Sequence, residues 1–170
     1  RTVSEYWDWR SASFGFSDET RKYWRTALSH AFPPGNGLRV LDVGTGTGFM
    51  AALAASRGNR VWGIDVSGKM LEEARRNLVR EGLTVDLALG DANAPDFPDE
   101  FFDVIVCRNV LWTLSDPLVA LRAWHGLLRK GGRVVVSDGT WQPSGGKRLL
   151  RVMRRRFGYF LPGGGEDVPC

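Results

Sequence analysis

The sequence predicts an α/β fold in which a parallel β-sheet is covered by helices. Short apolar runs alternate with longer segments whose apolar residues recur at helical spacing, and this alternation is typical of such sheets. Four of the five apolar runs are rich in β-branched residues, which favour strands. The first run also leads into a glycine-rich turn that opens a helix. We therefore expect sheet and helices to alternate over residues 39–138.

Five buried strands account for the apolar runs. Each run is short and bounded by glycine, charged or turn-forming residues, as expected for strands inside a covered sheet. The predicted strands cover residues 39–43, 60–64, 85–89, 102–107 and 133–137.

Three helices are predicted between these strands, over residues 48–56, 67–81 and 116–128. Ser67 and Asp116 are good N-cap residues, and Pro117 fits the first helical position. Glycines that can end a helix follow each segment. These glycines are Gly58, Gly82, Gly131 and Gly132.

The length of 170 residues suits one globular domain, 1–170, in three parts. Residues 1–37 form an N-terminal helical cap, with helices over 3–10 and 18–32. Residues 38–139 form the core. Residues 140–170 form a basic amphipathic helix over 147–160 and a tail rich in proline and glycine.

Composition excludes several protein classes. With 43% hydrophobic and 25% charged residues the chain is an ordinary globular sequence, and its net charge of +4 comes from the arginine-rich segment 147–156. The two cysteines, Cys107 and Cys170, rule out a disulfide framework and a cysteine-rich metal site. No segment approaches the roughly 20 apolar residues of a membrane span. We expect a cytoplasmic protein.

Asp42, Gly44, Gly46 and Gly48 mark the turn after the first strand, which is the segment with the most chemical content. Glycine allows positive φ angles and a close approach of the backbone to a ligand, and N–H groups at a helix start attract negative groups. The dinucleotide spacing G-x-G-x-x-G/A would place Phe49 where a small residue is needed, which argues against a nicotinamide dinucleotide. The turn predicts a site for a different ligand.

The spacing Asp-x-Gly-x-Gly-x-Gly resembles motif I of the class I S-adenosylmethionine-dependent methyltransferases. The fourth predicted strand and the segment 127–136 are similar to later motifs of that family, in the same order. The resemblance implies a Rossmann-like, doubly wound sheet with strand order 3-2-1-4-5, preceded by N-terminal helices. Residues 108–110 read Arg-Asn-Val, not the Pro-Pro-Tyr or Pro-Pro-Phe of enzymes that methylate exocyclic amines of bases. The chain is closer to the small-molecule branch, which includes quinone-biosynthesis enzymes.

The resemblance also implies the cofactor, S-adenosylmethionine, its product S-adenosylhomocysteine, and the residues that bind them. Asp65 ends the second strand, where a carboxylate can accept hydrogen bonds from both ribose hydroxyls. A plain turn aspartate is the alternative, although Ser67 is better placed to cap the next helix. Gly90, Asp91 and Ala92 resemble the adenine-binding step of the family. The predicted cofactor-binding residues are Asp42, Gly44, Thr45, Gly46, Gly48, Asp65, Val66, Met70, Gly90, Asp91, Ala92, Arg108, Asn109 and Arg10.

Four aromatic residues, Tyr6, Trp9, Phe14 and Trp112, are the candidates for contacting the substrate, and an aromatic face there can also attract the sulfonium of the cofactor. Packing in the core is the alternative for them, with Trp112 as the exception because it follows the fourth predicted strand at the expected substrate mouth. Arg10 could pair with the methionine carboxylate of the cofactor. No catalytic residue is predicted, because in-line positioning alone can supply much of the rate. The residue spacing suggests no metal site.

The leading functional hypothesis is methyl transfer to a small molecule by in-line displacement. Two alternatives stay open. One is an NAD(P)-dependent oxidoreductase. The other is a non-catalytic S-adenosylmethionine-binding or nucleic-acid-associated protein, which the basic segment 147–156 would suit. Nucleic-acid and membrane partners are not expected.

The end of the chain departs from the family, because its usual C-terminal antiparallel strand pair is not evident after Asp138. The fifth strand would then leave an open edge, which proteins usually cover. The C-terminal helix, a partner subunit in a homodimer, or a further segment of chain would cover it.

Overall fold

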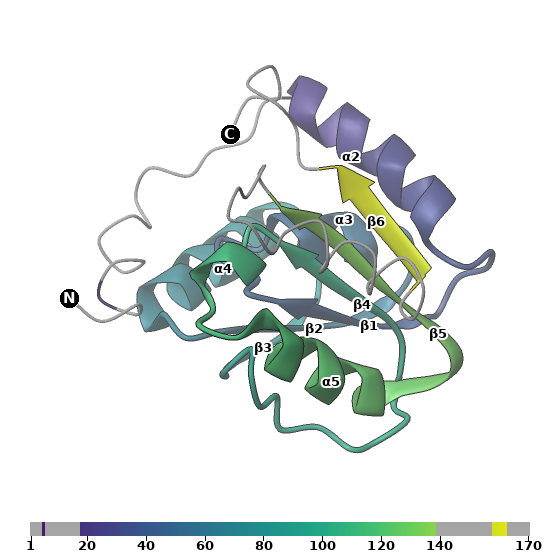
Figure 1. Ribbon diagram of the computed structural model, residues 1–170. Helices are drawn as coiled ribbons and strands as arrows, with labels where there is room; N and C mark the ends of the chain where they lie inside the picture. Colours follow the sequence, from purple (N-terminus) through teal and green to yellow (C-terminus); the bar gives the residue numbers. More distant parts are fainter. Residues whose placement is uncertain (1–4, 6–17, 139–157, 163–170) are drawn as a thin grey trace.

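The structure is a computed structural model that describes residues 5, 18–138 and 158–162, and it contains a parallel sheet with helices on both faces (Figure 1). The sheet has six strands in the order β3-β2-β1-β4-β5-β6. Its first five strands confirm the predicted order 3-2-1-4-5. The strands are β1 (Arg39–Val43), β2 (Arg60–Asp65), β3 (Asp86–Leu89), β4 (Phe102–Arg108), β5 (Leu128–Asp138) and β6 (Gly158–Pro162).

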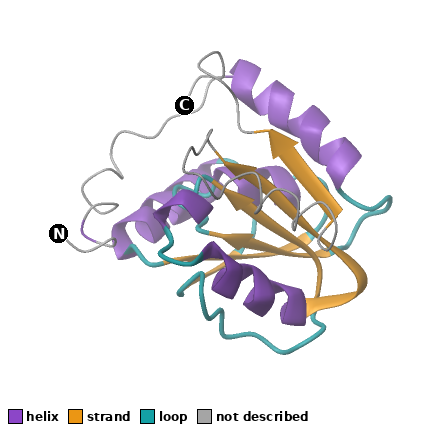
Figure 2. Ribbon diagram, in the orientation of Figure 1, coloured by secondary structure: helices purple, strands orange, loops and turns teal. Residues whose placement is uncertain are grey.

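In the described ranges from residue 18 onward, four α-helices and one short 3₁₀ helix connect or precede these strands (Figure 2). Ser67 caps its helix, because its hydroxyl accepts a hydrogen bond from the Met70 N–H. Asp116 caps the helix that begins at Pro117, because its carboxylate accepts a hydrogen bond from the Leu118 N–H. Both predicted caps are confirmed. The helices are α2 (Asp18–Ala31), α3 (Phe49–Ala55), α4 (Gly68–Arg80), α5 (Pro117–Leu127) and η2 (Leu111–Thr113).

Alternate residues of the strands point to two apolar layers, as the two-residue period of a strand requires. Val40 and Val104 pack in one layer with α2 and α3. Leu41 and Ile105 pack in the other layer with α5. The helices α2 and α5 accordingly lie on opposite faces of the sheet (Figure 1). The sheet is buried on both faces, and this arrangement leaves its carboxyl edge for a site.

The strand β5 starts earlier than predicted. The helix α5 ends at Leu127 and β5 begins at Leu128, not at Arg133 after the two glycines. Gly131 and Gly132 therefore lie inside the strand, and the prediction that they end the helix was wrong. The register of β5 against β4 shifts between Phe102 and Val104, and such an irregularity uses residues that tolerate unusual backbone, as Gly131 does at φ 82°.

The open edge of β5 is covered by a strand. The strand β6 pairs parallel to β5, with Val134 opposite Gly158 and Asp138 opposite Pro162. The prediction of a helix up to residue 160 was therefore wrong for residues 158–160. These residues form a strand because its hydrogen bonds to β5 satisfy backbone groups that the edge of β5 would otherwise leave unpaired. Residues 147–157 of that predicted helix, and the predicted helix over 3–10 except residue 5, lie outside the described residues.

The division into a cap, a core and a basic tail stays a prediction, because part of the cap and most of the tail lie outside the described residues. Within the part of the chain that the structure describes, no helix is both long enough and apolar enough to cross a membrane.

Candidate active site

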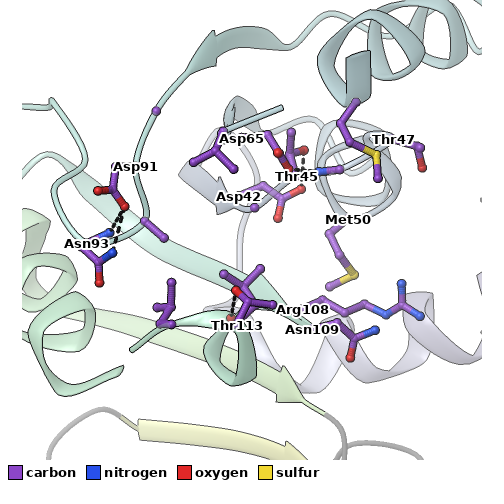
Figure 3. A pocket seen from close by; sticks show the side chains of 18 of the residues that line it. Asp42, Thr45, Thr47, Met50, Asp65, Asp91, Asn93, Arg108, Asn109 and Thr113 are labelled. Atoms are coloured by element: carbon purple, nitrogen blue, oxygen red, sulfur yellow. Dashed lines mark hydrogen bonds between the residues drawn. The ribbon is translucent and has the colours of Figure 1, made fainter. Parts of the chain in front are cut away.

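A cavity of about 430 Å³ lies at the carboxyl edge of the sheet (Figure 3). Ligand pockets in proteins typically measure about 300–1,000 Å³, and those of open α/β sheets lie outside the carboxyl ends of the strands. Residues from the ends of β1, β2, β3 and β4 contribute to it. The cavity is lined by Asp42, Gly44, Thr45, Gly46, Thr47, Phe49, Met50, Asp65, Val66, Met70, Gly90, Asp91, Ala92, Asn93, Arg108, Asn109, Val110, Thr113, Leu114 and Ser115.

The turn after β1 has left-handed backbone at each of its three marked glycines. Gly44, Gly46 and Gly48 have φ angles of 67°, 55° and 87°. A Cβ on Gly44 would collide with the side chain of Val110, and one on Gly48 would come within 3.1 Å of Ala74 Cβ in α4. At Gly46 a Cβ would meet no atom within 4 Å, so this part of the turn faces open space. The turn thus packs closely on two sides and is open toward the cavity.

Asp65 joins the end of β2 to this turn. Its Oδ2 accepts a hydrogen bond of 2.9 Å from the Gly46 N–H, and its Oδ1 accepts one of 2.9 Å from the Ser67 N–H. The side chain does not cap α4, since Ser67 has that role. The two hydrogen bonds fix the orientation of a buried carboxylate in the cavity wall, and each carboxylate oxygen can accept a second donor.

Asp42 is the most buried charged group of the cavity, with 1% of its surface exposed. The pKa of its carboxyl is raised to about 7, chiefly by burial and to a smaller extent by the charge of Asp65, against the opposing effect of hydrogen bonds from Thr45 and Ala51 and of the charge of Arg108. The Thr45 hydroxyl donates to Asp42 Oδ2 over 2.7 Å. Asp42 can therefore exchange a proton near neutral pH.

The end of β3 carries Asp91 in an exposed turn. Asp91 Oδ1 accepts hydrogen bonds from the Asn93 backbone N–H at 2.8 Å and from Asn93 Nδ2 at 3.0 Å. The position of the next residue, Ala92, is fixed by a hydrogen bond of 2.7 Å that its carbonyl accepts from the Trp124 indole N–H. A Cβ on Gly90 would lie 3.0 Å from Ile64 Cβ, so this turn packs tightly on β2. The strand end is thus a rigid platform at one side of the cavity.

Arg108 and Asn109 form the opposite wall, at the end of β4. The guanidinium carbon of Arg108 lies 5.3 Å from the centroid of the Trp24 ring and 5.4 Å from that of the Phe49 ring. Cation–π contacts of this kind contribute about 0.5–2 kcal/mol each. Asn109 has a φ of 58°, and its N–H donates to the Ser137 carbonyl. In Figure 3 Asp91 and Arg108 lie at opposite sides of the cavity.

The cavity brings together twelve of the residues that the sequence singled out for cofactor binding, from four strand ends. Gly48 lies behind the lining, where it allows close packing against α4. Trp112 is 46% exposed and does not line the cavity, and its backbone N–H donates to Asp138 Oδ2. The predicted residues Tyr6, Trp9, Arg10 and Phe14 lie outside the described residues.

Eight lining residues were missed by the sequence reasoning. Phe49 was considered only as an obstacle to dinucleotide binding, yet its position at the start of α3 places it in the wall. Val110, Thr113, Leu114 and Ser115 line the cavity because the chain turns at η2, where the Thr113 N–H donates to the Val110 carbonyl, and no local motif signals this turn. The missed residues are Thr47, Phe49, Met50, Asn93, Val110, Thr113, Leu114 and Ser115.

Charges in the cavity are unequal in sign. Asp65 and Asp91 are carboxylates, Asp42 is a third acidic side chain that is partly protonated near neutral pH because its pKa is about 7, and Arg108 is the one basic side chain among the described lining residues. Among the described residues, no group of three or more histidine, cysteine, aspartate or glutamate side chains is arranged to hold a metal ion. The arrangement suits an elongated organic ligand that carries more positive than negative charge.

The chain belongs to the methyltransferase domain family, whose model matches residues 41–136. This membership confirms the resemblance to class I S-adenosylmethionine-dependent methyltransferases. The matched segment holds most of β1, all of β2, β3 and β4, most of β5, and every residue that lines the cavity.

Curated relatives from three bacteria illustrate the family. The chain is 36% identical to the ubiquinone biosynthesis O-methyltransferase of Stutzerimonas stutzeri over 59% of this chain and 44% of that protein. It is 33% identical to the demethylmenaquinone methyltransferase of Clavibacter sepedonicus over 81% of this chain and 54% of that protein. It is 35% identical to the phosphatidylethanolamine N-methyltransferase of Cereibacter sphaeroides over 77% of this chain and 64% of that protein. The chain spans about half the length of these relatives.

Solved structures share the fold. The [4+2]-cyclase SpnF superposes with a TM-score of 0.70 at 26% identity, covering 79% of this chain and 55% of that one. A putative S-adenosyl-L-methionine-dependent methyltransferase from Methanococcus maripaludis superposes with a TM-score of 0.68 at 20% identity, covering 89% of this chain and 69% of that one. The Haemonchus contortus phosphoethanolamine N-methyltransferase 1, solved with S-adenosylhomocysteine, has a TM-score of 0.69 at 19% identity, covering 82% and 32%.

Proposed function

We propose that this domain transfers the methyl group of S-adenosylmethionine to a small-molecule acceptor in the cavity at the carboxyl edge of the sheet. The observation that carries the proposal is the order of polar groups along this edge. Asp91 follows β3, Asp65 ends β2, the glycine turn follows β1 and Arg108 ends β4. Since the sheet order is β3-β2-β1-β4, an elongated ligand across the strand ends meets these groups in that sequence.

The residues present fit S-adenosylmethionine on structural grounds. The turn leaves open space at Gly46, where a side chain would stand against a ligand. The excess of carboxylates suits a ligand with a sulfonium and an ammonium group but one carboxylate. When bound, S-adenosylmethionine supplies a methyl group on a positively charged sulfur, which is already activated for displacement.

Each part of the chain then has a role in holding the cofactor. Asp65 accepts hydrogen bonds from the ribose hydroxyls, and Asp91 with the Ala92 N–H contacts the adenine edge. Val66 and Met70 supply apolar surface beside the ribose. We assign the remaining proposed cofactor residues of the cavity to the methionine end, with Gly48 behind them in the turn, and these are Asp42, Gly44, Thr45, Gly46, Arg108 and Asn109. Arg10 lies outside the described residues and stays a prediction.

Positioning is the main catalytic contribution that we assign to the protein. Well-oriented reaction partners reach effective molarities of about 10⁵–10⁸ M, so an already activated methyl group needs alignment more than it needs a strong base. We nominate no catalytic residue. The aromatic candidates Tyr6, Trp9, Phe14 and Trp112 stay predictions for contact with the acceptor.

The acceptor belongs, in this proposal, to the small molecules. The relatives are named for ubiquinone biosynthesis, demethylmenaquinone and phosphatidylethanolamine, which differ in chemistry but are all small-molecule classes. The shared fold does not by itself define the reaction, since one structural neighbour is a cyclase. A cytoplasmic location, a homodimer and the absence of nucleic-acid partners stay predictions.

Isothermal titration calorimetry with S-adenosylmethionine, S-adenosylhomocysteine and NAD tests the cofactor. We expect micromolar binding of the first two ligands and no binding of NAD. Preference for NAD would support the oxidoreductase alternative and overturn the proposal. Methyl-labelled S-adenosylmethionine, incubated with a phenolic quinone precursor or with phosphatidylethanolamine vesicles, then tests transfer. Cofactor binding without transfer to any of a broad set of such acceptors would favour the non-catalytic alternative.

A further inference from the structure

Arg108 is distinguished from the other charged residues of the cavity by its sign and by its support. It is the one basic side chain among the described residues that line the cavity. Its guanidinium lies against two aromatic rings from different helices, Trp24 of α2 and Phe49 of α3, at 5.3 and 5.4 Å from their centroids. Two rings on one guanidinium restrict its position in a way that a solvated arginine lacks.

The support is itself buried. Trp24 is 4% exposed and Phe49 is 5% exposed, and both belong to the apolar layer between the sheet and α2 and α3. The indole N–H of Trp24 is buried and has no hydrogen-bond partner within the part of the chain that the structure describes. A buried donor without an acceptor is uncommon in native proteins, so hydrogen bonding of the indole does not account for the position of this ring.

The place of Arg108 defines which part of a ligand it meets. Asp91 and Arg108 lie at opposite sides of the cavity (Figure 3). If the adenine lies at Asp91 and the ribose at Asp65, the far end of the cofactor reaches β4, where Arg108 lies. That end carries the only carboxylate of S-adenosylmethionine, and guanidinium pairs with carboxylate through two parallel hydrogen bonds.

We infer that Arg108 binds the methionine carboxylate of the cofactor, and that Trp24 and Phe49 are positioning residues that hold its guanidinium for this contact. The inference rests on the proposed function and deepens it. It transfers to Arg108 the role that sequence reasoning gave to Arg10, and it gives α2 a part in cofactor recognition.

A pair of ligands isolates the carboxylate. S-adenosylhomocysteine and its decarboxylated analogue both keep the adenosine and the amine, and they differ only in the carboxylate. We expect the wild type to bind S-adenosylhomocysteine about ten- to a hundredfold more tightly in calorimetry, as charge-assisted hydrogen bonds predict. In Arg108→Gln this ratio should fall to near one, through loss of affinity for S-adenosylhomocysteine alone.

Variants of Trp24 test the positioning role. Trp24→Leu removes the ring, and we expect the affinity ratio to fall by several-fold, while Trp24→Phe keeps a ring and should restore most of it. A merely structural role would lower the affinity for both ligands together or lower the melting temperature, and would leave the ratio unchanged. Arg21→Gln is the matched control, because Arg21 also faces Phe49, at 5.8 Å, but does not line the cavity.

The outcomes separate the inference from the function beneath it. If the wild type binds neither ligand, the proposed function fails. If the wild type discriminates between the ligands and Arg108→Gln keeps that discrimination, the inference about Arg108 is wrong while the proposed function stands. Loss of discrimination in Arg10→Gln, with Arg108→Gln unchanged, would return the role to the N-terminal segment. A ratio that is unchanged in Trp24→Leu would overturn the positioning role.

Discussion

The two ends of the sheet hold their charged side chains in different ways. At the amino end, Asp103 accepts hydrogen bonds from the Arg39 N–H at 2.8 Å and from the Arg129 guanidinium at 2.9 Å. Arg39 and Arg60 also lie over the rings of Phe101 and Trp62, at 4.7 and 5.1 Å. These four charged side chains are thus paired with one another or placed on aromatic rings.

At the carboxyl end the same residue types surround a cavity. Asp42 and Asp65 are buried there, and the backbone is left-handed at Gly44, Gly46 and Asn109. Buried charge and strained backbone cost stability, and they persist where the surrounding structure enforces them. The comparison indicates that the amino end stabilises the fold, while the carboxyl end uses part of that stability to build a binding site.

Removing an aromatic ring from the amino end should give the largest loss of stability. Phe102 is fully buried and contacts the rings of Trp62, Phe97 and Phe101. We expect Phe102→Ala to lower the free energy of unfolding in urea by about 3–5 kcal/mol, because it leaves a cavity in the core. The folded fraction should bind S-adenosylhomocysteine as the wild type does. If the folded variant did not bind S-adenosylhomocysteine, the amino end would also be needed for binding, and the distinction between the two ends would be wrong.

Two glycines with left-handed backbone offer a matched test of crowding at the carboxyl end. Gly44→Ala should lower the free energy of unfolding by about 2–4 kcal/mol, since its Cβ would strike Val110 and its φ is 67°. Gly131→Ala, with φ 82° and no atom near its Cβ, should cost only about 1 kcal/mol. Equal losses in urea unfolding would show that the close approach to Val110 has no energetic weight.

The raised pKa of Asp42 predicts a dependence of stability on pH. Because burial moves this pKa from 3.8 to about 7, the folded state holds its proton more tightly than the unfolded state does. The associated stability is full below about pH 4 and is lost as the pH rises through 7. Asp42→Asn should remove this loss, so that its free energy of unfolding gains on the wild type between pH 4 and 7. Parallel pH profiles for the two proteins would contradict the assignment.

The smallest effect is expected from the exposed ion pair of the amino end. The Arg129 side chain is 52% exposed, and its 2.9 Å contact with Asp103 is accessible to solvent and salt. Arg129→Gln should change the free energy of unfolding by less than about 1 kcal/mol. A larger loss, abolished by high salt, would mean that this end depends on its charges more than on its rings.

Local signals explain what could be predicted from the sequence. Ser67 and Asp116 were correctly predicted as caps, because capping depends on residues within one helical turn. The structure brings the glycine turn and Asp65 together, because the turn follows β1 and Asp65 ends the neighbouring parallel strand β2.

Non-local contacts explain the rest. Residues 158–160 of β6 continue the helical spacing of the segment before them, and their pairing with β5, which is distant in the sequence, leaves no local signal. Gly131 and Gly132 were read as a helix end because an irregularity in strand pairing has the same composition as a C-cap. Thr113 and Leu114 were missed because their place in the cavity depends on how the chain after β4 folds back.

The affinity for S-adenosylhomocysteine of two aspartate variants, one from each end of the sheet, tests the central claim most directly. Asp65→Ala alters the cavity, and Asp103→Ala removes hydrogen bonds at the amino end. We predict that calorimetry finds binding weakened about tenfold or more in Asp65→Ala, as loss of hydrogen bonds to a charged group implies, and unchanged in folded Asp103→Ala. Equal affinities in the two variants, or loss of binding in Asp103→Ala alone, would contradict the placement of the cofactor at the carboxyl edge.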